Sequence, residues 1–136
     1  MSIRAIPLLI FAFLLYNALA LFPSDLSTDQ FLRQPLFAIP MLNGNEWIFS
    51  WGDLIILLLL VLLFFELLKA TYTSSTSLLD HGLSMLVFVV CLIEFLMVKQ
   101  AQTSVFFFIV VATLIDVIAG YTIGIRVARR DLSIGG

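Results

Sequence analysis

Charged side chains are scarce in this sequence, and their scarcity excludes several classes of protein. Only 12% of the 136 residues are charged, whereas soluble domains carry about 25%. The net charge is −2, and no basic cluster occurs before the C-terminal Arg126, Arg129 and Arg130. Proteins that bind nucleic acids need a basic surface to meet the phosphates. We therefore expect no nucleic-acid partner.

Cysteine and histidine occur only once each. Cys91 alone cannot form an intrachain disulfide, and one cysteine with one histidine does not supply the familiar ligand sets of zinc or haem. The chain also lacks the Walker, HExxH, GxSxG, CxxC and GxGxxG motifs. We therefore expect no metal, no cofactor and no catalytic residue, and the protein is not expected to be an enzyme.

Apolar residues are abundant instead, at 62% of the chain, against about 45–50% in soluble domains. One soluble core of this size cannot bury so much apolar surface, but a lipid bilayer solvates it. A spanning helix needs about 20 mostly apolar residues, and no segment shows the alternation of a barrel strand. The sequence predicts a single all-α integral membrane domain, 1–136, with four transmembrane helices. Their expected ranges are 3–22, 54–72, 78–98 and 105–125.

The first of these segments also fits a signal peptide. Met1–Arg4 is short and positively charged, Ala5–Leu15 is apolar, and Ala18–Ala20 has the small-residue pattern of a cleavage site. We expect a retained helix. Both interpretations leave residue 21 outside, so the orientation of the later helices is the same.

The basic residues near the helix ends predict the orientation, because cytoplasmic flanks are enriched in lysine and arginine. With the N-terminus inside, two basic residues lie outside, Arg33 and Lys99, and five lie inside. We expect both termini in the cytoplasm, in a bacterial inner membrane, with the C-terminal arginines at the lipid headgroups. The five inner residues are Arg4, Lys69, Arg126, Arg129 and Arg130.

The outer loop 23–53 is too long for a bare connection. Ser27–Gln30 has the pattern of a capping box, which predicts a short helical turn that ends before Pro35. Asn43 and Gly44 form a dipeptide typical of type I′ turns, because both residues tolerate positive φ. The loop therefore predicts a small β-hairpin at 36–51.

The second arm of this hairpin carries three alternating aromatic residues, Trp47, Phe49 and Trp51, which should share one face. Two interpretations remain open for this face. It is either an interfacial belt at the level of the headgroups, or a docking surface for another membrane subunit.

Ionisable groups inside apolar helices are costly and hold whatever functional signal the sequence has. At a rise of about 1.5 Å per residue, Glu66 and Asp116 reach similar depths, and Lys69 and His81 lie further inward. These four residues are predicted to form one intramembrane polar cluster. Two carboxylates in such a site can share a proton, whereas a Lys69–Glu66 pair at i,i+3 is the structural alternative.

The third helix should turn His81, Ser84, Cys91 and Glu94 towards the bundle, because they lie on one side of a helix. Glu94 is expected near the outer surface, apart from the cluster. Asp80 is expected to cap the start of this helix, in a capping box that opens at residue 77.

A stripe of small residues runs along the fourth helix at four-residue spacings, interrupted by one acid. Such stripes let helix backbones approach closely, within one bundle or between chains. We expect Asp116 to face protein because it shares this stripe. The small residues of the stripe are Ala112, Gly120 and Gly124.

Two functions from different classes fit these features. The first is a non-enzymatic membrane subunit that stabilises or helps assemble a larger membrane complex or a homo-oligomer. The second is a small oligomeric proton-coupled transporter or channel that uses Glu66 and Asp116 and takes a proton or a small molecule as substrate. In both cases the partners include the lipid bilayer and other membrane proteins or a second copy.

Overall fold

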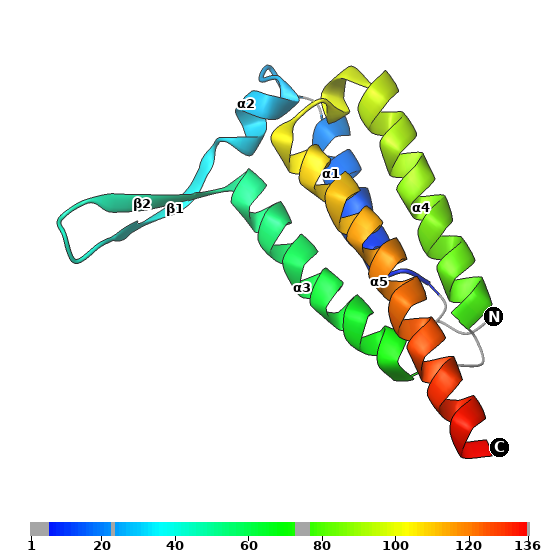
Figure 1. Cartoon of the computed structure of the whole chain (residues 1–136). Helices are drawn as coiled ribbons and strands as arrows, with labels where there is room; N and C mark the ends of the chain where they lie inside the picture. The colour runs from blue at the N-terminus through cyan, green and yellow to red at the C-terminus, as the bar shows by residue number, and fades with distance from the viewer. Residues whose placement is uncertain (1–5, 23, 73–76, 136) are drawn as a thin grey trace.

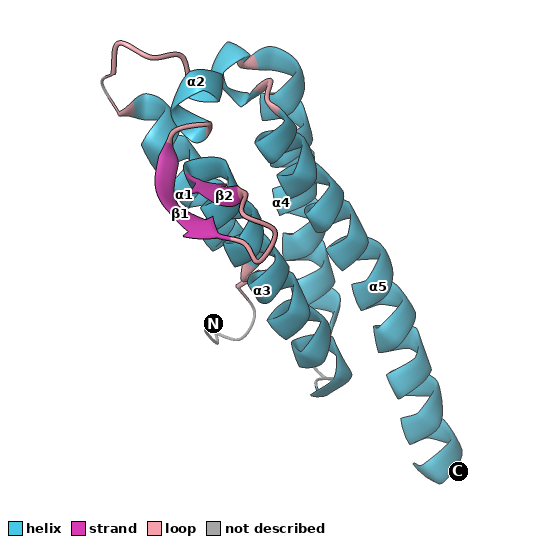
Figure 2. Cartoon of the chain, turned by 90° about the vertical axis from the view of Figure 1, so that its left-hand side faces the viewer, coloured by secondary structure: helices cyan, strands magenta, loops and turns pink. Residues whose placement is uncertain are grey.

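The computed structural model describes residues 6–22, 24–72 and 77–135, which are mostly helical with one small sheet (Figure 1). Two short helical elements and the sheet lie at one end of the helical body, which we call the hairpin end, and Figure 2 shows the same end from the side. The elements are α1 (Leu9–Leu21), α2 (Thr28–Leu32), β1 (Pro35–Pro40), β2 (Glu46–Ser50), α3 (Trp51–Tyr72), α4 (Ser77–Met97), η2 (Lys99–Ala101) and α5 (Ser104–Gly135).

Helix α1 starts later than the sequence predicts. The expected helix was 3–22, but within the described residues α1 begins at Leu9 and has 13 residues. Pro7 explains the late start, because proline disfavours helical backbone at the residue before it. The first turn is tight, with Ile10 N–H donating to the carbonyl of Pro7 at 3.2 Å. The helix is therefore about 20 Å long.

The loop after α1 folds largely as predicted. Ser27 and Gln30 form the expected reciprocal capping box at the start of α2, and β1 pairs with β2 in an antiparallel hairpin. The turn differs from the prediction, because Gly44 has a φ of 91° but no non-glycine residue in the described part has a positive φ. A type I′ turn needs a positive φ at both of its central residues. The hairpin is instead closed by a bond from Met41 N–H to the Asn45 carbonyl, at 2.7 Å.

Helix α3 begins three residues before the predicted position 54. Ser50 and Asp53 form a second capping box: the Ser50 N–H donates to Asp53 Oδ2 at 3.0 Å, and the Asp53 N–H to Ser50 Oγ at 3.3 Å. This box satisfies two N–H groups at the end of the strand and the start of the helix. Trp51 consequently belongs to the helix and not to the strand.

Helix α5 is the centre of the fold. It packs against α1, α3 and α4, and α3 and α4 lie on either side of it in Figure 1. Thr103 precedes the helix, and its Oγ1 accepts a bond from the Phe106 N–H at 3.3 Å. The helix extends past the predicted end at 125 and beyond the rest of the helical body.

Two helical segments are long and apolar enough to cross a membrane, Trp51–Thr71 and Ser104–Ile123. The segments Leu9–Leu21 and His81–Met97 are apolar but shorter, among the residues described. The expectation of four helices of spanning length is therefore wrong by this criterion. Buried residues make up 17% of the α3 segment and 44% of the α5 segment, so α3 lies at the periphery.

The start of α3 offers a test of how tightly the hairpin end is packed. A Cβ on Gly52 would lie 3.0 Å from Val105 Cγ2 and 3.2 Å from the Leu32 carbonyl oxygen. We expect Gly52→Ala to destabilise the protein by about 1–3 kcal/mol, measured as a lower unfolding temperature in detergent. Gly82 in α4 has no atom within 4 Å of its Cβ position, so Gly82→Ala is the matched control. Equal unfolding temperatures for the two variants would contradict the close packing at Gly52.

Candidate functional site

A buried carboxylate holds the start of α1 against α3. Glu66 is 5% exposed, and its Oε2 accepts a bond from the Leu8 N–H at 2.9 Å. Its Oε1 lies 3.1 Å from Lys69 Nζ, which is the ion pair that the i,i+3 spacing predicts. The same ammonium donates to the Ile6 carbonyl at 3.0 Å. We call Ile6, Leu8, Glu66 and Lys69 the α1 clamp.

The clamp satisfies backbone groups that α1 itself cannot satisfy. The first N–H groups of a helix have no partner within it, and an anion is favourable there because of the helix dipole. Glu66 supplies that anion at the residue before α1, and Lys69 neutralises it. Both charges are thus used to hold one segment of backbone in place.

The other two members of the predicted cluster lie on other helices. Asp116 is buried on α5, in agreement with the expectation that it faces protein. His81, on α4, stacks on Tyr121 of α5 with ring centroids 4.4 Å apart. The structure brings Glu66 and Lys69 together on α3, while the ring of His81 is placed against α5.

The small-residue stripe of α5 is used inside this chain. Gly120 is buried, and a Cβ there would lie 3.1 Å from two ring atoms of His81. Ala112 is also buried, at 4% exposure. The absence of a side chain at Gly120 therefore lets the His81 ring approach the α5 backbone, as expected for a small residue at a helix contact. The environment of Gly124 lies outside the described side chains.

Helix α4 turns its polar side inward, as predicted. Ser84 and Cys91 are buried, and Glu94 Oε2 accepts a bond from Asn17 Nδ2 of α1 at 3.2 Å. The side chain of Asp80 is outside the described part, so its predicted capping role stays a prediction.

A second polar contact, at the hairpin end, was not predicted. Tyr16 is 1% exposed; its hydroxyl lies 2.7 Å from Thr103 Oγ1 and donates to the Gln100 carbonyl at 2.7 Å. Its ring packs edge-on against Phe106. Tyr16 and Asn17 are the two polar residues within the otherwise apolar α1. That isolation is the sequence signal that singles them out.

An open pocket of about 550 Å³ with a mixed polar and apolar lining lies beside this contact. It is bounded by the chain around α2 on one side and by η2 on the other. Hydroxyl, amide, carboxylate and ammonium groups line it, so it can hydrogen-bond water and small polar molecules. Its polar lining residues are Ser24, Ser27, Thr28, Asp29, Lys99, Gln100, Gln102 and Thr103.

An apolar groove of about 270 Å³ runs between α3 and α5. Each helix contributes four lining residues at spacings of i, i+3, i+4 and i+7, which is one face of a helix over two turns. Every lining residue is apolar. They are Ile56, Leu59, Leu60 and Leu63 of α3, and Phe108, Val111, Ala112 and Ile115 of α5.

The predicted aromatic face of the hairpin exists with one change of membership. Trp47 and Phe49 pack together, with ring centroids 5.7 Å apart. Trp51 has left the strand and stacks on Phe31 of α2 at 5.5 Å. Phe37 of β1 takes its place, stacking on Phe49 at 4.9 Å.

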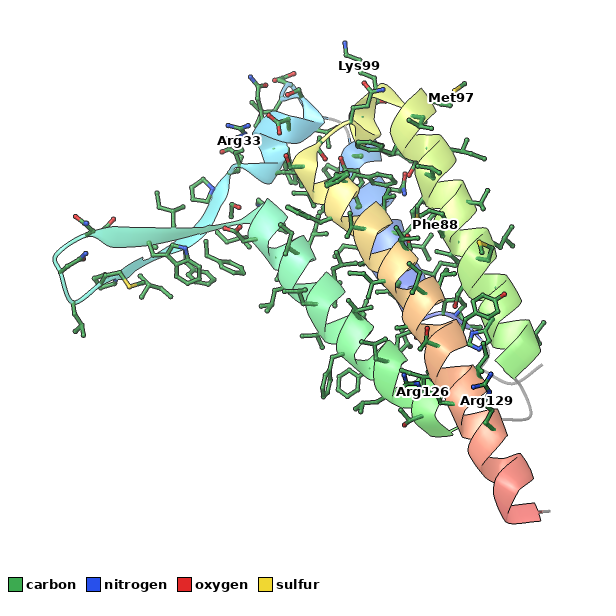
Figure 3. The ribbon with its side chains drawn as sticks, viewed as in Figure 1. Arg33, Phe88, Met97, Lys99, Arg126 and Arg129 are labelled. Carbon is green, nitrogen blue, oxygen red and sulfur yellow. The ribbon has the colours of Figure 1, made fainter. Side chains whose placement is uncertain are left out.

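The basic residues divide between the two ends of the helical body. Figure 3 shows Arg33 and Lys99 at the hairpin end and Arg126 and Arg129 near the opposite end. Both of the latter side chains are exposed, as a contact with headgroups requires. The side chain of Arg130 is outside the described part.

In the described part of the chain, no group of three or more His, Cys, Asp or Glu side chains is placed to hold a metal ion. No family model, no curated protein and no solved structure matches the chain.

Breaking the α1 clamp should destabilise the fold. Glu66→Ala leaves the Lys69 ammonium and the Leu8 N–H without their carboxylate partner, and removing one partner of a buried pair costs about 3–5 kcal/mol. We expect a loss of this size in reversible unfolding in mixed micelles. The matched control is Arg33→Ala, which breaks the exposed Arg33–Asp29 pair and should cost less than about 1 kcal/mol. Equal losses in the two variants would show that the clamp is not structural.

Proposed function

We propose that this chain is a non-enzymatic integral membrane subunit whose α3–α5 groove receives a transmembrane helix of a partner. The partner is another membrane protein or a second copy, and the contact stabilises or helps assemble the complex. The observation that carries this proposal is the groove itself, in which two apolar helix faces of matching period leave space between them.

A helix is the occupant that fits the groove best. Helices recognise apolar grooves through side chains at i, i+3, i+4 and i+7, and both walls present that spacing here. Ala112 is the one small residue among the lining residues, and small residues allow close helix contact in a membrane. At about 1.5 Å per residue the lined stretch extends about 10 Å, enough for two turns of a third helix.

Four spanning segments remain our proposal for the membrane domain, although α1 has 13 residues and the described apolar part of α4 is also short. Helix α4 as a whole has 21 residues. Non-helical backbone is tolerated at membrane depth where protein groups satisfy its hydrogen bonds. The α1 clamp does this for Ile6 and Leu8, and Pro7 between them is buried. Residues 6–8 can therefore lengthen the path of α1 through the membrane.

The proposed orientation places both termini in the cytoplasm, with the hairpin end outside, in a bacterial inner membrane. The support is the sequence count of basic residues, five in the flanks predicted to be inside against two in those predicted to be outside. The exposed Arg126 and Arg129 beyond the apolar part of α5 fit contact with anionic headgroups.

Proton-coupled transport stays an alternative prediction. Its proposed site needs Glu66 to exchange protons, whereas Glu66 binds a backbone N–H and a lysine in the α1 clamp. Protonating it would weaken both bonds. This use of Glu66 favours the structural role.

The orientation can be tested with single cysteines in a Cys91→Ala background. Gln102→Cys is exposed at the hairpin end and Arg126→Cys at the other end. We expect a membrane-impermeant maleimide to label position 102 in intact cells or spheroplasts, and position 126 only after lysis. The Arg126 substitution still leaves four basic residues in the inner flanks against two in the outer flanks, so the orientation should not change. If only position 126 were labelled before lysis, the protein would have the opposite orientation to the one proposed.

The groove can be tested with photo-crosslinking amino acids in native membranes. Leu60 lies in the groove and is 57% exposed, and Leu57, outside it, is 51% exposed. We expect a discrete protein adduct from position 60 and mainly lipid adducts from position 57. An adduct with twice the 15.2 kDa mass of the chain identifies a second copy as the partner. If the partner is another subunit, mass spectrometry of the adduct identifies it. Lipid adducts alone at both positions would contradict the proposed function.

A further inference from the structure

One face of the β1–β2 hairpin consists of large apolar side chains. In the antiparallel register Phe37 is opposite Phe49 and Ile39 is opposite Trp47, so the four side chains project to one side. We call these four residues the aromatic face. Phe37, Ile39 and Trp47 are exposed, and Phe49 is partly buried.

The other face of the hairpin is different. Ala38 is opposite Ile48, and Pro40 is opposite Glu46. Glu46 is the one charged residue between positions 35 and 50. This face therefore carries the one charge of the hairpin beside the exposed Ile48, whereas the aromatic face has four large apolar side chains and no charge.

The hairpin is placed at the level where a membrane surface is expected. Strand β2 ends at Ser50 and α3, a helix long enough to cross a membrane, begins at Trp51. The hairpin projects sideways from this point (Figure 1 and Figure 2). Figure 3 shows bulky side chains of the hairpin on the side along which α3 extends. That side would face the bilayer.

A two-stranded hairpin of this kind needs a surface to pack on. Isolated two-stranded hairpins are marginally stable in water, and every residue from Pro35 to Ile48 is exposed. The main contact of the hairpin with the helices is at its base, where β2 meets α3.

We propose that the aromatic face of the hairpin lies on the lipid bilayer at the hairpin end, with its rings among the headgroups and Glu46 turned towards water. The inference rests on the proposed function, because it needs α3 to cross the membrane. Tryptophan favours this interfacial region, where one part of its ring is apolar and the N–H can reach a polar partner. The hairpin then acts as a lateral anchor for the helical body.

The backbone sets the depth of this anchor. A two-stranded sheet has two free edges, and their polar groups cannot be left without partners in hydrocarbon. Prolines at both ends of β1, Pro35 and Pro40, remove two N–H donors. The remaining groups need water or headgroups. The hairpin is therefore held at the interface and does not enter the hydrocarbon.

The test uses the two tryptophans of the chain as separate reporters. The full-length protein is purified and reconstituted in phosphatidylcholine vesicles, as Trp51→Phe to observe Trp47, and as Trp47→Phe to observe Trp51. Brominated lipids of defined depth quench from the membrane, and iodide quenches from water. We expect shallow brominated lipids to quench Trp47, with a blue-shifted emission and little iodide quenching.

The Trp51 reporter separates the two proposals. Lipid quenching of Trp51 together with iodide quenching of Trp47 would overturn the hairpin anchor while α3 still crosses the membrane. Lipid quenching of neither residue would overturn both the anchor and the proposed membrane function.

Two substitutions on adjacent residues provide a matched control for the face. Ile39→Lys puts a charge on the aromatic face and should abolish most of the lipid quenching of Trp47. Ala38→Lys puts the same charge on the opposite face and should leave that quenching unchanged. Equal quenching in these two variants would also overturn the proposal, because the hairpin would then have no lipid-facing side.

Discussion

Backbone polar groups placed among apolar helices must find partners, and this constraint governs the fold. Pro7 prevents a helix from continuing towards the N-terminus, so the carbonyl of Ile6 and the N–H of Leu8 fall outside α1. Glu66 and Lys69 bind these two groups and each other. The buried carboxylate of Glu66, its partly buried partner Lys69 and the irregular segment depend on one another, since an unpaired buried charge or an unpaired backbone group would be costly alone.

The rest of the molecule is arranged around α5. Gly120 admits the ring of His81 from α4, and the hydroxyl of Tyr16 ties α1 to the residues before α5. Helix α3 is packed less completely than α5, which leaves the groove between the two helices open. The hairpin extends from the start of α3. The polar interior thus holds the chain together, while the proposed contacts with a partner and with lipid use apolar surface.

The sequence predicts those features that depend on local pattern. The capping box at Ser27, the hairpin and the Lys69–Glu66 pair follow from short spacings. The start of α3 was missed although Ser50 and Asp53 have the spacing of a capping box. The bond from Leu8 to Glu66 joins residues 58 apart, and no local pattern encodes it. The groove likewise depends on how two helices pack.

Glu66 serves as a fixed structural partner of the α1 backbone. The most direct measurement is a solid-state NMR distance, in lipid, between the labelled Leu8 amide nitrogen and the Glu66 side-chain carboxyl carbon. We expect a clear dipolar coupling, because the nitrogen and Oε2 are 2.9 Å apart. A coupling too weak to detect would contradict this role, because the start of α1 would then be held by something other than Glu66.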